Sequence, residues 1–146
     1  MVAGILIPAP VADEMITQAR AELPNEACGL LAGRFLADDG ADTLRYYPAR
    51  NAEASPLRYS VHPDDLVRIV FAIDEAGQDL VGIFHSHTRS PAVPSATDRR
   101  AAQYPGAFYV LVTLADPTAP PERVLRAWRI HGGHAFEVPL RVGERT

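Results

Sequence analysis

The sequence predicts an α/β domain in which helices flank a mixed central β-sheet. Short apolar runs typical of strands alternate with segments of helical periodicity, and the last three strand-like runs follow one another near the C-terminus. Interleaved helices favour parallel strand neighbours, whereas consecutive strands favour antiparallel ones, so the sheet is expected to be mixed. The 146 residues fit one compact domain over residues 1–146, and neither an internal repeat nor a linker divides them.

The N-terminal part of the chain is expected to contain four strands and one helix. Residues 10–23 are predicted to be helical because their apolar side chains recur on one helical face. That face consists of Val11, Met15, Ile16 and Ala19. Short apolar runs bounded by proline or polar residues indicate strands. These runs lie at residues 5–7, 27–34, 43–48 and 57–61.

A second helix is expected to begin at His62-Pro63-Asp64-Asp65 and to end at Gly77. Proline at the first helical position and acidic side chains in the first turn both favour a helix N-terminus, and glycine favours a C-terminus. The predicted core face consists of Leu66, Ile69, Val70 and Ile73. After this helix, an apolar run at residues 80–84 is too short for a helix and leads directly into His85.

The C-terminal part is expected to add one short helix, at residues 95–102, and three strands. The strands are predicted at residues 108–114, 125–131 and 135–141. Three prolines between residues 115 and 122 make that stretch the most flexible part of the expected domain.

Composition and charge narrow the classes of function. The formal net charge is −4 with both signs mixed along the chain, which argues against a nucleic-acid-binding protein. No window approaches the length of a membrane span, and the N-terminal apolar run is too short for a signal peptide. The single cysteine, Cys28, fits a reducing compartment and is expected to be a small core residue. We therefore expect a cytoplasmic protein.

Residues 85–98 carry the most informative pattern. In a strand, His85 and His87 point to the same side and can therefore bind one metal ion, with Asp98 as a third ligand. Taken singly, a His-x-His pair is more often a solvated strand end, and Ser95-x-x-Asp98 is more often a helix cap. Capping and metal binding are compatible, because a capped helix start would hold Asp98 rigidly.

The full combination resembles a known family. His-x-His, seven residues and Ser-x-x-Asp match the JAMM motif of the MPN-domain (JAB1/MPN/Mov34) metallopeptidases. Upstream, Pro24-Asn25-Glu26-Ala27-Cys28-Gly29 is similar to that family's glutamate motif. The resemblance covers nearly the whole chain in the order of its elements. It implies the MPN/JAB1 fold, which is cytidine-deaminase-like, and the size is that of small stand-alone prokaryotic members.

The resemblance implies that His85, His87 and Asp98 hold one Zn²⁺. Glu26 would be the general base for the zinc-bound water. Without the family motif, Glu26 would be interpreted as a solvated acid between a helix and a strand. Ser95 would donate a hydrogen bond to the oxyanion of the reaction. These roles are chemically coherent, since zinc acidifies water and polarises a carbonyl, a carboxylate can relay the proton, and a fixed donor stabilises developing charge.

The resemblance also implies a substrate. Small prokaryotic members of the family are associated with ubiquitin-like sulfur-carrier proteins ending in Gly-Gly, so such a carrier is the expected partner and cysteine one expected released residue. The short connection between Asp98 and the strand at residue 108 leaves no room for the insertions that read linkages between ubiquitin molecules. A homodimer is compatible with the sequence.

Three other functions would require different residues or partners. A zinc hydrolase of small peptides or amides would use the same residues without a protein partner. A non-catalytic MPN interaction module would carry a broken ligand set, whereas all four key positions are intact. A nucleotide deaminase would carry His-x-Glu and Pro-Cys-x-x-Cys, which are absent. Between the two histidines and Asp98, Arg89 and Ser90 are interpreted as solvated loop residues within reach of a substrate.

Overall fold

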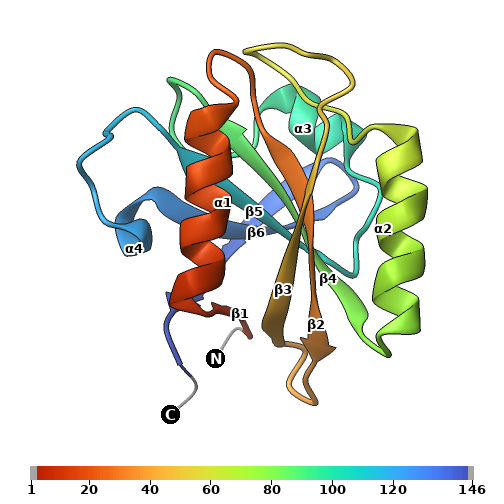
Figure 1. Ribbon diagram of the computed structural model, residues 1–146. Coiled ribbons are helices and arrows are strands. Elements are labelled where there is room, and N and C mark those ends of the chain that lie inside the picture. The colour runs from red at the N-terminus through yellow and green to blue at the C-terminus, as the bar shows by residue number, and fades with distance from the viewer. Residues whose placement is uncertain (1–2, 145–146) are drawn as a thin grey trace.

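One mixed sheet runs through the molecule, with helices on both faces (Figure 1). The computed structural model describes residues 3–144. The strands are β1 (Ile5–Ile7), β2 (Cys28–Phe35), β3 (Ala41–Ala49), β4 (Asp79–His87), β5 (Phe108–Thr113), β6 (Leu125–His131), β7 (His134–Val138) and β8 (Leu140–Val142). Their order across the sheet is β7-β6-β5-β4-β2-β3-β1-β8. β4 pairs in parallel with β5, and β1 pairs in parallel with β3 and β8, whereas the other pairs are antiparallel. The expected α/β class with a mixed sheet is confirmed.

The sheet divides the core into two clusters, and helices cover each of them. α1 (Ala9–Ala21) and the short α4 (Pro121–Val124) pack on one face, where Met15 and Val124 meet strand side chains such as Phe84. α2 (Pro63–Glu75) and α3 (Ala96–Ala101) cover the other face, where Ile69 and Ile73 of α2 are buried. Within residues 3–144, none of the helices is long and apolar enough to cross a membrane.

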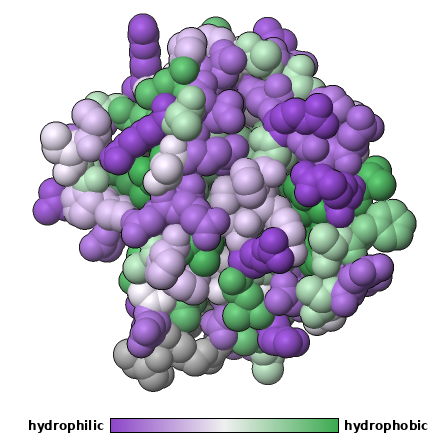
Figure 2. Space-filling view, in the orientation of Figure 1, coloured by the Kyte–Doolittle hydropathy of each residue, from purple (hydrophilic) through white to green (hydrophobic). Residues whose placement is uncertain are grey.

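The α2 helix begins and ends as the sequence predicts. The ring of His62 caps it by accepting a hydrogen bond from the backbone N–H of Asp64, and Gly77 after the helix adopts a left-handed φ of 68°. The prediction that Val70 belongs to the core face is wrong, because its side chain is 41% exposed. Val70 follows the buried Ile69, and each helical residue turns the direction of the side chain by about 100°. Together with Val67 and Phe71 it forms an apolar outer face on α2, visible at the right of Figure 2.

The predicted strand at residues 57–61 is also wrong. Of these residues only Val61 forms a β-bridge, an isolated one with Asn51. Residues 57–60 form a loop. The apolar residues that suggested a strand instead lie in two separate environments. Leu57 is 80% exposed and lines a cleft, whereas Tyr59 packs against the core cluster under α2.

In the C-terminal part, the last predicted strand is divided in two, and the proline-rich stretch leads into a short helix. The predicted strand at 135–141 is broken at Pro139 into β7 and β8, which lie at opposite edges of the sheet. Proline at this point ends the first pairing, and its carbonyl accepts a hydrogen bond from the N–H of Ile5. The stretch 115–122, predicted to be flexible, ends in the first residues of α4, because Pro121 occupies the first turn of that helix.

Candidate metal centre and active-site cleft

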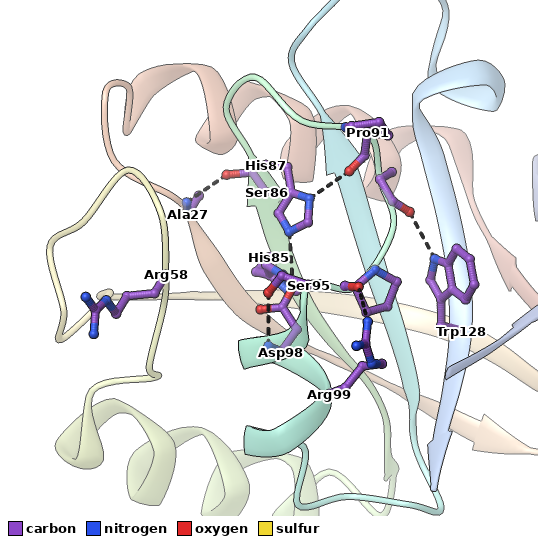
Figure 3. Close-up of polar contacts among 12 residues, drawn as sticks. Ala27, Arg58, His85, Ser86, His87, Pro91, Ser95, Asp98, Arg99 and Trp128 are labelled. Atoms are coloured by element: carbon purple, nitrogen blue, oxygen red, sulfur yellow. Dashed lines mark hydrogen bonds and ion pairs between the residues drawn. The ribbon is translucent and has the colours of Figure 1, made fainter. Parts of the chain in front are cut away.

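Strand β4 and helix α3 bring His85, His87 and Asp98 together (Figure 3). β4 extends through both histidines, so their side chains emerge on the same face of the sheet. Nε2 of His85 and Nε2 of His87 each lie 3.1 Å from Oδ2 of Asp98. The three residues are 1%, 4% and 8% exposed, and one ligand atom from each lies within 4.8 Å of the others.

A capping box holds Asp98 in place at the start of α3. Oγ of Ser95 accepts a hydrogen bond from the N–H of Asp98 at 3.0 Å, and the N–H of Ser95 donates to Oδ2 of Asp98 at 2.9 Å. The capping interpretation of Ser95-x-x-Asp98 is therefore confirmed. The same carboxylate faces both histidines, so capping orients the oxygen that a metal ion would use.

The two histidine rings are oriented in different ways. Nδ1 of His87 lies 2.7 Å from the carbonyl oxygen of Pro91, which places the proton on Nδ1 and leaves Nε2 for the cluster. The ring of His85 instead stacks on Tyr59, with centroids 4.1 Å apart and an interplanar angle of 18°. Nδ1 of His85 is buried and has no hydrogen-bond partner among residues 3–144. Neither Pro91 nor Tyr59 was expected at the site.

The loop between the histidines and Asp98 is anchored at two further points. Nε1 of Trp128 donates to the carbonyl of Ala92 at 3.0 Å, and the guanidinium of Arg99 donates to the carbonyl of Pro94 at 3.2 Å (Figure 3). Trp128 is buried, as expected of a packing residue, and it also ties β6 to this loop. These contacts make the spacing between His87 and Asp98 a fixed feature of the fold.

The chemistry of this cluster fits a divalent cation such as Zn²⁺. Two imidazole nitrogens and one carboxylate oxygen are a donor set typical of zinc sites in enzymes. Burial raises the pKa of Asp98, but the neighbouring rings of His85 and His87 outweigh it and hold that pKa well below its usual range. Burial lowers the pKa of His85 and favours its neutral, metal-binding form. Burial also lowers the pKa of His87, but the contacts of its ring with Asp98 and Pro91 together outweigh burial and raise it. The site thus presents an ionised carboxylate and, at His85, a neutral imidazole.

Glu26 lies two residues before the start of β2 and is 4% exposed. Its N–H donates to the carbonyl of Ser55 at 2.8 Å, and its own carbonyl accepts a hydrogen bond from Nδ2 of Asn51 at 3.0 Å. Burial raises the pKa of Glu26 to about 7, although the nearby His87 opposes the shift. Oε1 is buried without a hydrogen-bond partner in the described part of the chain. The carboxyl group is therefore poised to titrate near neutral pH.

A cleft of about 810 Å³ connects these groups to the solvent. Glu26, His87 and Ser95 all line it, so the candidate base and the candidate oxyanion donor face the same space as one residue of the candidate metal centre. The remaining lining residues are Leu23, Pro24, Pro56, Leu57, Thr88, Arg89 and Ser90. No local sequence feature predicts that the loop at residues 51–60 contributes Pro56 and Leu57 to the cleft, because the contact depends on strands that are distant in the sequence.

Cys28 takes no part in this cleft. It is fully buried, and its thiol lies 3.5 Å from the carbonyl oxygen of Arg50. Burial raises the pKa of Cys28 to about 12, so the thiolate does not form at neutral pH. The expectation of a small core residue is confirmed.

Comparison with known proteins identifies the family of the chain. A family model described as prokaryotic homologs of the JAB domain matches residues 8–131. The chain belongs to this family. It is 38% identical over 142 residues to a protein named CysO-cysteine peptidase from Mycobacterium tuberculosis, covering 97% of this chain and 92% of that relative. It is 39% identical over 104 residues to a desampylase from Haloferax volcanii, covering 68% and 73% of the two chains. These names confirm the expected JAB-type peptidase.

Solved structures agree with the JAB assignment. A protein from Desulfitobacterium hafniense superposes with a TM-score of 0.86 at 35% identity, covering 97% of this chain and 94% of that protein. A JAB1/MPN domain protein from Archaeoglobus fulgidus gives a TM-score of 0.56 at 20% identity, with 94% and 98% covered. The second likeness shows the fold alone, and it confirms the expected MPN/JAB1 architecture.

Proposed function

We propose that this JAB-family chain is a zinc-dependent peptidase or isopeptidase. Its substrate would be a ubiquitin-like sulfur-carrier protein, cleaved at the bond that follows the C-terminal Gly-Gly tail, with cysteine as one released residue. The observation that carries the proposal is that the cluster of His85, His87 and Asp98 reaches, through His87, the cleft that Glu26 and Ser95 also line.

In this proposal His85, His87 and Asp98 hold a zinc ion. When bound there, zinc lowers the pKa of water and polarises a carbonyl group. The chain itself supplies the orientation of the ligands, because Pro91 fixes the His87 ring and Ser95 fixes the Asp98 carboxylate. Groups that orient metal ligands commonly matter for metal affinity almost as much as the ligands do.

Glu26 would act as the general base. A base with a pKa near the working pH combines a useful ionised fraction with sufficient proton affinity, and burial brings the pKa of Glu26 to about 7. Its carboxylate would accept the proton of the attacking water and deliver that proton to the departing amine. The backbone of Glu26 forms hydrogen bonds with Ser55 and Asn51, and these hold the carboxyl group at the cleft.

Ser95 would stabilise the oxyanion. Its Oγ already accepts the N–H of Asp98, so the hydroxyl hydrogen is left to donate towards the cleft. A donor aimed at developing negative charge stabilises the transition state more than the ground state.

The choice of substrate rests on the named relatives and on the shape of the site. A CysO-cysteine peptidase relative that aligns with 97% of this chain supports a carrier bearing a C-terminal cysteine, and the desampylase relative supports a protein conjugate. A glycine tail suits a buried metal centre, because glycine lets the backbone come close. A small-peptide or amide hydrolase is the second candidate, and the open cleft admits such substrates as well.

The proposal is tested by intact-mass spectrometry. A sulfur carrier ending in Gly-Gly and bearing one extra C-terminal residue is incubated with the zinc-loaded protein, with a chelator, and with the Glu26→Gln variant. We expect loss of the added residue only with the zinc-loaded wild type. Survival of the carrier alongside hydrolysis of short peptides would favour the second candidate, and activity in the presence of the chelator would contradict the zinc mechanism.

A further inference from the structure

The cleft contains one charged side chain that the proposed chemistry does not use. Of the residues that line it, Glu26, His87 and Arg89 can carry a charge, and the first two already have roles. Arg89 is exposed, and the chain as a whole carries a formal net charge of −4. The positive charge at the cleft therefore opposes the overall charge of the protein and provides a local site for an anion.

Arg89 is held by fixed neighbours on both sides. Oγ1 of Thr88 lies 3.4 Å from the carbonyl oxygen of Pro56, and the carbonyl of Ser90 accepts a hydrogen bond from Oγ1 of Thr113 at 2.8 Å. The Arg89 backbone is thus anchored to the loop at residues 51–60 and to the end of β5. The guanidinium group itself forms no hydrogen bond or ion pair with any of residues 3–144, so its donors are available to a ligand.

The cleft also has an apolar wall, which differs in chemistry from the Arg89 side. It consists of Leu23, Pro24, Pro56 and Leu57 and carries no charge. Leu23 and Leu57 are 47% and 80% exposed, so this wall offers apolar surface to a bound chain. An anionic end of a substrate would therefore be directed to the Arg89 side, two residues beyond His87 in sequence.

We propose that Arg89 binds the free α-carboxylate of the residue released from the carrier, which would make the enzyme preferentially a carboxypeptidase. This inference rests on the proposed function. In a carrier extended by one residue, the α-carboxylate lies one residue past the bond that breaks, whereas an isopeptide-linked lysine side chain places no carboxylate there. Guanidinium donors match a carboxylate in a two-pronged geometry.

The reaction itself is hydrolysis of one amide bond. The bond between the glycine carbonyl carbon and the amine nitrogen breaks, water supplies a hydroxyl group to the carbon, and the amine leaves with the remaining proton. Arg89 takes no part in bond making. It selects substrates whose leaving group carries a carboxylate and holds that group next to the metal centre.

The test compares two carriers that differ in one group. Both end in Gly-Gly-Cys, one with a free α-carboxylate and the other with a carboxamide, and kcat/KM is measured by intact mass for zinc-loaded wild type and Arg89→Ala. We expect the wild type to prefer the carboxylate about tenfold, as the loss of one charge-assisted contact implies. Arg89→Ala should cleave both carriers at the carboxamide rate, and Arg89→Lys should recover part of the preference.

The matched control is Arg58→Ala. Arg58 is also exposed and lies on the neighbouring loop, but its side chain points away from the histidines in Figure 3 and does not line the cleft. This variant should keep the wild-type preference. Equal cleavage of the two carriers by the wild type, or an equal loss on both carriers in Arg89→Ala, would overturn the role of Arg89 while leaving the peptidase function intact. Cleavage of neither carrier by the wild type would instead refute the proposed function, and the role of Arg89 with it.

Discussion

The rings of Tyr59 and His85 are stacked, with centroids 4.1 Å apart and planes 18° from parallel. Histidines that bind a metal usually donate a hydrogen bond from the N–H of their second ring nitrogen to a carbonyl or carboxylate. Nδ1 of His87 makes this contact with the carbonyl of Pro91. Nδ1 of His85 has no such partner among residues 3–144. Stacking on Tyr59 therefore provides the lateral restraint that a hydrogen bond provides for His87.

Replacement of Tyr59 should weaken metal binding. Tyr59→Ala is expected to lower zinc affinity about tenfold, the smaller of the effects typical of groups that orient a ligand. Tyr59→Phe keeps the ring and should stay close to wild type. Competition with a chromophoric chelator measures the affinities, and thermal unfolding of the metal-free proteins shows whether stability has changed. Wild-type zinc affinity in Tyr59→Ala would show that the stack does not orient His85.

Ser95→Ala should lower both the rate of catalysis and the stability of the fold. Loss of one oxyanion donor is expected to lower kcat by roughly 10²–10³-fold. The variant should also lose about 1 kcal/mol of unfolding free energy, because α3 loses its N-cap. Steady-state kinetics and urea unfolding give the two values. Ser90→Ala, which changes a hydroxyl at the same cleft outside the cap, is the control and should retain both properties; a kcat for Ser95→Ala near wild type would exclude the oxyanion role.

The stability of the metal-free protein should depend on the ionisation of Glu26. Its pKa is raised by burial from 4.5 to about 7, so the unfolded chain releases the proton more readily than the folded protein. This group therefore lowers the unfolding free energy as pH rises from about 4.5 to about 7. Glu26→Gln cannot ionise and should gain stability relative to wild type between pH 5 and pH 8. Urea unfolding of both proteins at the two pH values checks this, and a difference that does not change with pH would contradict it.

Zinc should stabilise the fold through Asp98. A ligand at a hundredfold excess over its Kd contributes about 2.7 kcal/mol to the unfolding free energy when it binds the folded state alone. We expect an increase in Tm with zinc that a chelator reverses and that Asp98→Ala abolishes. Asp74→Ala, at an exposed aspartate on α2, should retain the increase. An equal zinc effect in both variants would place the bound metal elsewhere.

The strand and helix pattern could be predicted well where the determining residues lie within the segment itself. The alternation of side chains in β4 predicts that His85 and His87 share a side, and the cap at Ser95 predicts the orientation of Asp98. Glu26 could be placed only through the family resemblance. On its own sequence it is an acid between a helix and a strand, and its burial depends on Ser55 and other residues distant in the chain.

The errors concern segments whose environment depends on distant parts of the chain. Leu57 and Tyr59 alternate like strand residues, yet one lines the cleft and the other packs under α2. Val70 fits an apolar helical face but points outward, since the sheet contacts a narrower stripe of α2 than the sequence suggests. Pro139 interrupts an apolar run, and the two halves pair with β6 and β1 at opposite edges of the sheet.

The most direct test of the proposed chemistry measures bound zinc and carrier cleavage on the same samples of wild type and Glu26→Gln. Because Glu26 lies outside the metal-binding cluster, we expect one zinc per chain in both proteins. Cleavage by the variant should be slower by roughly 10²-fold or more, as removal of a general base implies. Zinc-loaded Glu26→Gln that cleaves the carrier at the wild-type rate, or a wild-type protein that binds no zinc, would contradict the mechanism.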